Sequence, residues 1–275
     1  MKETISSNSL FHFTPKLEYL KSILTEGFLP SYCLENFDNF KFITGDDQTT
    51  EFEMAVPMVC FCDIPLSKVK SHMRQYGYYG IGLTKEWGLE SGISPLIYSS
   101  QQSATTASLE TSLRYFIYHP AFSKDEMMFR QYSNLLRLVR YTKPYEGRFF
   151  RKGQYLKSPV VFYNEREWRY VPDVAIRNER SKSPVQPWFT KEVFLHLKAE
   201  KDSFGVSSLH KLNEILRINH PLPFQLAHIR YILVQKESEI RPLLQLLKKS
   251  KVYRESDVDI LASKILTKPQ IFEDF

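Results

Sequence analysis

Residues 160–171, VVFYNEREWRYV, constrain the fold most, because charged residues alternate there with apolar and aromatic ones. Such alternation predicts a β-strand, whose successive side chains point to opposite faces. Glu165, Glu167 and Arg169 then share one face, and Trp168 lies on the other, over a core. Two carboxylates on one face repel each other unless a cation lies nearby, and Arg169 is the local candidate. The acidic face is either a solvated strand edge or part of a binding site.

The first thirty residues predict a strand, a helix and a loop in that order. Residues 10–14, LFHFT, are typical of a short aromatic strand with His12 at its centre. Apolar residues at helical spacing predict a helix over residues 17–26, and Gly27 stands where a C-terminal cap belongs. The polar segment 35–53 is interpreted as a loop.

The rest of the chain predicts a mixture of helices and strands. Strands are expected at residues 56–61, 76–83, 95–98, 191–198 and 229–235. Helices are expected at residues 66–75, 84–90 (or a turn), 104–118, 209–217, 238–249 and 257–266, the last with Ser256 as N-cap. Residues 129–141 fit a helix or a strand, and residues 142–158 a basic loop. We expect one α+β domain over residues 1–275, with a helical C-terminal part from about residue 205.

Composition narrows the setting of the protein. Three cysteines do not make a disulfide framework, and no Cys or His pairs have the spacing of a zinc site, so no metal is expected. The first residues lack the apolar core of a signal peptide, and no apolar run is long enough to cross a membrane. A cytoplasmic protein is the expectation.

The net charge of +6 favours encounters with polyanions. Basic residues concentrate in residues 137–143, 148–152 and 177–182. These runs favour contacts with the phosphates of a nucleic acid, although a basic run is more often a solvated surface. Lys157 allows the same two interpretations.

Three stretches carry a resemblance to a known family. They are residues 10–30 (LFHFTPKLEYLKSILTEGFLP), 59–88 (VCFCDIPLSKVKSHMRQYGYYGIGLTKEWG) and 162–172 (FYNEREWRYVP). Together they resemble the AbiGi-type abortive-infection family of bacterial phage-defence proteins. The resemblance covers about the first two-thirds of the chain and implies an antitoxin role with a cognate toxin as partner.

The order of these stretches is also similar to that of ADP-ribosyltransferases, including DarT-type toxins that modify nucleic acids. That resemblance implies a split central β-sheet with flanking helices, and NAD as substrate. It implies that Glu167 is the catalytic acid and Glu165 the first acid of a Glu-x-Glu pair. Cys62 stands where these enzymes often have serine. The residues implied to bind NAD are His12, Phe13, Thr14, Cys62, Tyr76, Tyr79 and Arg169, with Tyr78 as a further candidate to stack on nicotinamide.

These residue types suit the implied chemistry. Breaking the nicotinamide glycosidic bond passes through an oxocarbenium-like centre. The carboxylate of Glu167 can stabilise that developing positive charge, and Glu165 can orient or deprotonate an acceptor. His12 can donate or accept a hydrogen bond near neutral pH, although a buried core histidine is the commoner case.

Two functions of different classes therefore remain. The first is an NAD-dependent mono-ADP-ribosyltransferase of a bacterial defence or toxin system, with RNA or DNA as the favoured acceptor. The second is a non-catalytic antitoxin that keeps the transferase fold and neutralises a partner toxin. Expression of the protein alone discriminates them, because only an active transferase is expected to be toxic.

Overall fold

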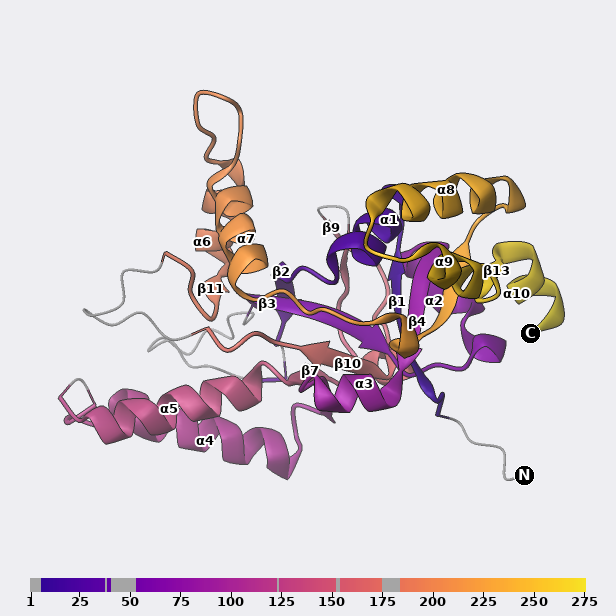
Figure 1. Cartoon of the computed structure of the whole chain (residues 1–275). Helices are drawn as coiled ribbons and strands as arrows, with labels where there is room; N and C mark the ends of the chain where they lie inside the picture. Colours follow the sequence, from indigo (N-terminus) through magenta and orange to yellow (C-terminus); the bar gives the residue numbers. More distant parts are fainter. Residues whose placement is uncertain (1–5, 38, 41–52, 123, 152–153, 175–183) are drawn as a thin grey trace.

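The computed structural model describes residues 6–37, 39–40, 53–122, 124–151, 154–174 and 184–275. These residues form a mixed β-sheet with helices packed around it, which confirms the expected α+β class (Figure 1). Seven strands follow one another across the sheet in the order β13 (Ile265–Thr267), β12 (Ile229–Val234), β4 (Tyr79–Thr84), β1 (Ser9–Thr14), β3 (Glu53–Cys62), β10 (Glu167–Tyr170) and β5 (Ser94–Pro95). Two more, β2 (Ser31–Asn36) and β11 (Phe189–Thr190), pair with β3. Only β12 and β13 are a parallel pair within this sheet.

The long strand β3 joins two groups of strands. Its residues 53–58 pair with β2, and its residues 59–62 pair with β10. Two smaller pairs lie outside the sheet, namely β6 (Ile97–Ser99) with β7 (Thr142–Pro144) and β8 (Phe150–Arg151) with β9 (Gln154–Tyr155). A likeness of this sheet to that of ADP-ribosyltransferases stays a prediction.

The helices pack in groups against the two halves of the sheet. The α-helices are α1 (Leu17–Glu26), α2 (Lys70–Tyr76), α3 (Lys85–Glu90), α4 (Ala104–Tyr118), α5 (Glu126–Val139), α6 (Lys191–Ala199), α7 (Ser208–Asn219), α8 (Ile240–Ser250), α9 (Glu255–Ala262) and α10 (Lys268–Asp274). The 3-10 helices are η1 (Leu66–Lys68), η2 (Phe162–Glu165), η3 (Leu226–His228) and η4 (Glu237–Glu239).

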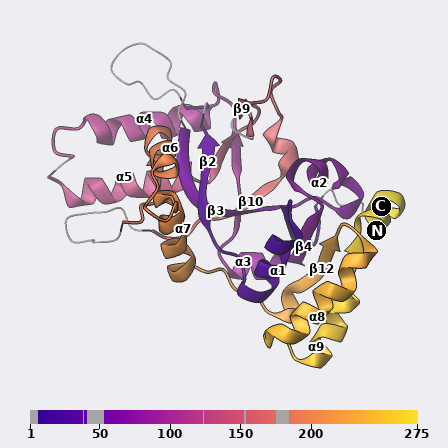
Figure 2. The same ribbon diagram turned by 90° about the horizontal axis from the view of Figure 1, so that it is seen from above.

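Alternation along β12 explains why both faces of this part of the sheet are covered. Ile232 and Val234 join the apolar core formed with α1, α8 and α9. Leu233 points to the other face and joins a second core, formed with α2 and α10. Figure 2 shows α8 and α9 beside β12, with α2 near β4.

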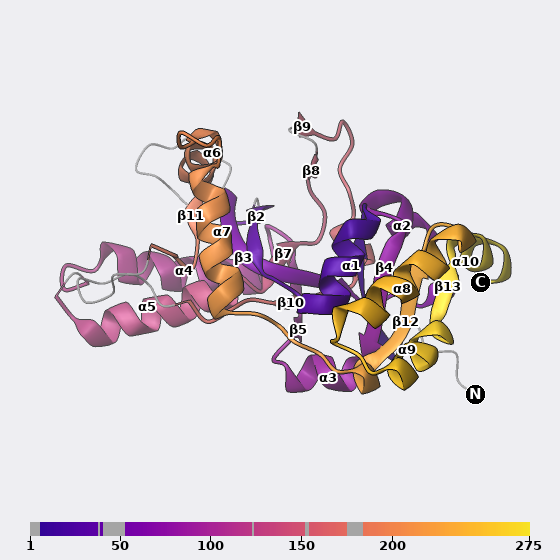
Figure 3. The ribbon, with the colours of Figure 1, turned by 45° about the horizontal axis from the view of Figure 1, so that its top comes forward.

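Alternation along β3 separates two helical hairpins in the same way. Val56 and Met58 belong to a core with Leu113 of α4 and Leu136 of α5. Ala55, which directly precedes Val56 and points to the other face, belongs to a core with α6 and α7. Figure 3 shows the α4–α5 and α6–α7 hairpins extending from this end of the molecule. Two separate segments that follow β3 in the chain therefore bring helices to both of its faces.

Most of the elements expected in the first half are confirmed. The helices α1 and α4 have the predicted bounds, and Gly27 is the C-cap of α1. The strand predicted at residues 76–83 begins only at Tyr79, because α2 continues to Tyr76 and ends at Gly77 with a φ of 131°. Residues 129–141, which fitted either a helix or a strand, fall largely within the helix α5.

The strand predicted over residues 160–171 is wrong in its first half. Residues 162–165 form η2, and Arg166 follows in the left-handed region with a φ of 46°. Such a residue turns the chain sharply, so only Glu167–Tyr170 continues as a strand. Glu165 and Glu167 therefore do not share one strand face, and Tyr163 is exposed.

The strand predicted at residues 191–198 is also wrong. The side chain of Thr190 accepts a hydrogen bond from the amide of Val193 and caps α6, which begins at Lys191. The loop predicted at residues 142–158 contains β7, β8 and β9. Of the loop predicted at residues 35–53, the ends belong to β2 and β3, and residues 41–52 lie outside the described part.

The C-terminal part contains the strand expected at residues 229–235, as β12, which joins the main sheet. It adds a short strand, β13, and ends in α10, neither of which the sequence patterns revealed. Arg254, not Ser256, is the N-cap of α9. No helix in the described part of the chain has the length and apolar character that crossing a membrane requires.

Candidate functional site

The three motifs singled out in the sequence lie on three neighbouring strands. Phe11, next to His12 on β1, is aligned with Cys62 at the end of β3. Cys62 is aligned in turn with Glu167 at the start of β10. The chain thus brings residues from its beginning and middle to one place in the sheet.

A cavity of about 920 Å³ opens beside these strands. Its walls come from α1, α2, α7 and β1 to β3, together with segments near β7 and β10. His12, Phe13, Thr14, Tyr76, Glu165 and Glu167, six of the nine predicted site residues, line it. This size is in the range of pockets that hold small-molecule ligands and cofactors.

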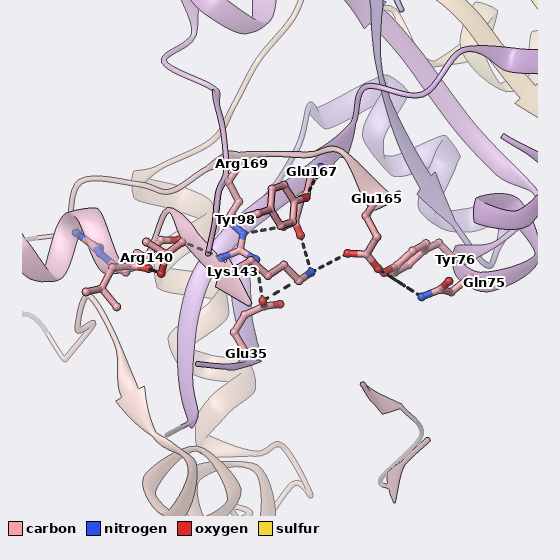
Figure 4. A network of polar contacts seen from close by, with 11 residues as sticks. Glu35, Gln75, Tyr76, Tyr98, Arg140, Lys143, Glu165, Glu167 and Arg169 are labelled. Atoms are coloured by element: carbon pink, nitrogen blue, oxygen red, sulfur yellow. Dashed lines mark hydrogen bonds and ion pairs between the residues drawn. The ribbon is translucent and has the colours of Figure 1, made fainter. Parts of the chain in front are cut away.

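Five charged side chains form a network of ion pairs beside this cavity (Figure 4). The ammonium of Lys143 donates to Glu165 Oε2 at 2.8 Å and to Glu167 Oε2 at 2.7 Å. Arg169 donates through Nε to Glu167 Oε1 and through Nη2 to Glu35 Oε2, both at 2.7 Å. The network therefore holds three carboxylates and two cations.

The oppositely charged partners in this network keep Glu167 and Lys143 charged despite their burial. Burial alone would raise the pKa of Glu167, but Arg169 and Lys143 outweigh it and hold that pKa well below its usual range. Burial would likewise lower the pKa of Lys143, whereas the surrounding carboxylates hold it well above its usual value. Glu167 is thus ionised and Lys143 protonated at neutral pH.

Glu165 reaches the same network from η2. Its Oε1 accepts a short hydrogen bond from the hydroxyl of Tyr76 and a longer one, at 3.5 Å, from Gln75 Nε2. Burial and the neighbouring carboxylate raise the pKa of Tyr76, so this hydroxyl keeps its proton. The end of α2 thereby fixes one side of Glu165 while Lys143 fixes the other.

Two neutral histidines contribute to the cavity walls. His12 Nδ1 lies 2.8 Å from the carbonyl oxygen of Cys60, which can only accept, so Nδ1 carries the proton and Nε2 is the acceptor. Burial lowers the pKa of His12, more than the bond to Cys60 raises it. Burial also lowers the pKa of His72 to about 4. The ring of His72 lies 4.4 Å from that of Tyr76, centroid to centroid.

The remaining predicted residues do not line the cavity. Cys62 is buried in an apolar core, and burial raises the pKa of its thiol. The hydroxyl of Tyr79 donates to Glu239 Oε1 at 2.7 Å, and its ring packs in the core beside α1 and α8. Arg169, with no exposed side-chain surface, contacts the carboxylates without lining the cavity. Tyr78 packs near Lys268, 4.1 Å from its ring centroid to Nζ.

Sequence patterns missed several members of the site. Glu35 and Lys143 fell in predicted loops, and His72 within a helix had no pattern of its own. The one available signal was chemical, since two neighbouring carboxylates require a cation beyond Arg169. Among the described residues, no group of three His, Cys, Asp or Glu side chains is placed to hold a metal ion.

The structure only partly allows the basic runs to serve as a surface for phosphates. Arg140 and Lys143 of the run 137–143 are buried, at 4% and 6% exposure, so these two side chains do not form a surface for phosphates. Residue 152 and the run 177–182 lie outside the described residues. Lys157 is exposed.

Comparison with known proteins places the chain in a family. A family model described as "Putative abortive phage resistance protein AbiGi, antitoxin" matches residues 26–235. The abortive phage resistance protein AbiGi of Lactococcus lactis subsp. cremoris is 29% identical over 261 residues, covering 90% of this chain and 99% of that protein. No solved structure matches the chain significantly. The family model spans well over half of the sequence, and the chain therefore belongs to the AbiGi family of abortive phage resistance proteins.

Proposed function

We propose that this AbiGi-family protein acts in anti-phage defence as an NAD-dependent mono-ADP-ribosyltransferase. The observation that carries the proposal is the joint position of His12, Thr14, Glu165 and Glu167 on one cavity. Their order along the chain is the order that the resemblance to ADP-ribosyltransferases implies. NAD is the proposed substrate of this cavity.

The electrostatics of the site support this chemistry. Three carboxylates against two cations leave one surplus negative charge beside the cavity. A fixed negative charge stabilises the positive charge that develops on the ribose when the nicotinamide bond breaks. Glu167 lies between the two cations and remains ionised at neutral pH. In this proposal Glu167 stabilises the oxocarbenium-like centre, and Glu165 orients the acceptor.

A direct test uses labelled NAD. The purified protein is incubated with NAD labelled in its adenylate part and with bacterial extract, beside the variant Glu167→Gln. We expect labelled macromolecules or free ADP-ribose from the wild type only. No labelled macromolecule together with no NAD breakdown by the folded wild type would exclude the transferase proposal.

Nuclease treatment of the same samples tests the acceptor. A nucleic-acid acceptor is proposed because the net charge is +6 and because some of the lysines, such as Lys157, are exposed. Release of the label by nuclease, but not by protease, is the expected result. Label that survives nuclease and is released by protease identifies a protein acceptor instead.

A second candidate is a non-catalytic antitoxin. The structure offers one observation in its favour: both carboxylate oxygens of Glu167 are already occupied by the protein's own cations. The description of the family model also names an antitoxin. Growth of cells expressing the protein alone separates the two functions, because an antitoxin should be harmless and an active transferase toxic. If a neighbouring gene encodes a toxin, restored growth on coexpression with that toxin supports the antitoxin.

A further inference from the structure

The ammonium of Lys143 bridges the carboxylates of Glu165 and Glu167, which belong to two different secondary-structure elements. Glu165 ends a 3-10 helix, and Glu167 begins a strand after the left-handed residue Arg166. Lys143 Nζ lies within 2.8 Å of an oxygen of each. Its side chain is only 7% exposed, and the ring of Phe162 covers it at 4.8 Å from Nζ to the centroid. Without this cation, the two carboxylates would face each other across a poorly hydrated space.

The strand that carries Lys143 does not belong to the main sheet. In β7, Lys143 is aligned with Tyr98 of the parallel strand β6. The hydroxyl of Tyr98 accepts a hydrogen bond from the backbone amide of Glu167 at 2.8 Å. Both aligned residues of this strand pair therefore contact the same glutamate of β10.

The helical hairpin α4–α5 connects these two strands along the chain. The hairpin begins shortly after β6 and ends shortly before β7. At its end, the carbonyl oxygen of Arg140 accepts a hydrogen bond from Arg169 Nη1 at 3.0 Å. The strand that precedes the hairpin, through Tyr98, and the C-terminal end of the hairpin, through Arg140, thus both contact β10, while the hairpin itself extends from the body of the protein (Figure 1).

We propose that Lys143 is a positioning residue of this site, which holds the carboxylates of Glu165 and Glu167 together beside the cavity and is itself placed by the α4–α5 hairpin. This inference rests on the proposed function for its role in a reaction. The electrostatic coupling between Lys143 and Glu167, however, does not depend on NAD and can be measured without it. The resemblance to ADP-ribosyltransferases assigns no role to this lysine.

The charge environment of Lys143 sets the expected effect of removing it. Titratable and charged groups surround its ammonium on five elements: Cys33 and Glu35 on β2, His72 and Tyr76 on α2, Tyr98 on β6, Glu165 on η2, and Glu167 and Arg169 on β10. Loss of the ammonium leaves Arg169 as the cation nearest Glu167. An opposite charge within hydrogen-bond distance lowers a carboxyl pKa by about 1–3 units, so Lys143→Met should raise that of Glu167 by about that much.

The experiment follows the side-chain carboxyl carbon of Glu167 by NMR in protein labelled with ¹³C in glutamate. The Glu167→Gln spectrum assigns the signal. We expect the midpoint of Glu167 to rise by one pH unit or more in Lys143→Met, and to stay near the wild-type value in Lys143→Arg. Lys249→Met is the matched control, because Lys249 is exposed on α8, and it should change nothing. An unchanged midpoint in Lys143→Met overturns the inference.

A second variant protects the test against misfolding. If Lys143→Met does not fold, Lys143→Met combined with Glu165→Gln removes the repulsion that its loss creates, and the Glu167 midpoint is compared with that of Glu165→Gln alone. NAD cleavage measured on the same samples should fall about tenfold or more in Lys143→Met and recover partly in Lys143→Arg. An inactive wild type defeats the proposed function, whereas the NMR midpoint decides the coupling of Lys143 to Glu167 in either case.

Discussion

The variant Glu167→Gln should lower both stability and activity, by amounts that the structure allows to be separated. The glutamine oxygen can accept from Lys143 or from Arg169, but its amide group then faces the other cation as a donor. One charge-assisted hydrogen bond is lost, at a cost of about 2 kcal/mol. Glu35 and Glu165 still balance the two cations. The cost should therefore stay below the roughly 3–5 kcal/mol seen when a buried charge is left alone.

A buried residue of an ion network cannot be neutralised without a change in stability. A domain of ordinary stability, about 5–15 kcal/mol, nevertheless remains more than about 99% folded after a loss of 2 kcal/mol. A fall in NAD cleavage of about 10²–10³ at 25 °C would then report on the reaction and not on unfolding.

Glu165→Gln is the matched variant. Its amide can accept from Lys143 and donate to the hydroxyl of Tyr76, so its stability cost should be the smaller of the two. Because Glu165 is expected to act on the acceptor, this variant should impair transfer more than cleavage to free ADP-ribose.

Urea unfolding at pH 7 gives the free energy of unfolding for each variant, and initial rates of NAD cleavage and of transfer give the activities. Equal and mild effects of Glu167→Gln and Glu165→Gln on both rates would refute a catalytic role for Glu167. An unchanged unfolding midpoint for Glu167→Gln would refute the energetic account of the buried network.

Two further predictions concern α2 and its C-cap, Gly77. The folded-state pKa of His72, about 4, lies below its unfolded value of 6.5, so His72 favours the folded state above pH 6.5 and this contribution is lost as the pH falls toward 4. The difference corresponds to at most about 3 kcal/mol, and urea unfolding of His72→Phe across this pH range should show a flatter profile than the wild type. Gly77→Ala would bring a Cβ atom to 2.2 Å from the carbonyl oxygen of Thr14, so it should cost clearly more than about 1 kcal/mol. Gly205→Ala, also at positive φ but in open space, is its control, and an equal loss of thermal stability in both would contradict the steric argument.

The sequence could predict elements whose hydrophobic period is long and unambiguous. The helix at residues 17–26 has several apolar residues at helical spacing and a glycine at its end, and its bounds were correct. The buried run at residues 56–61 similarly predicted the centre of β3. The motifs of His12, Cys62 and Glu167 were grouped from the sequence, and the fold places them on adjacent strands.

Other parts depended on interactions that a local pattern does not contain. Residues 191–198 fit the period of a strand. They form a helix because Thr190 caps its N-terminus and because its apolar side chains pack on α7. The left-handed conformation of Arg166 divides a stretch that alternates as a strand should. Lys143 belongs to the site only because the α4–α5 hairpin returns the chain to β6, and no local period encodes that return.

The position of β12 has a consequence for how the protein is made. β4 pairs with β1 on one edge and with β12 on the other. During synthesis β1, β3 and β4 emerge before residues 229–234, and a long stretch of chain with helices α3 to α7 is made between β4 and β12. Until then the nascent chain presents the backbone amides and carbonyls of β4 as an open edge, which invites pairing with other chains. This edge of β4 is therefore covered only once β12 has been synthesised and has paired with it.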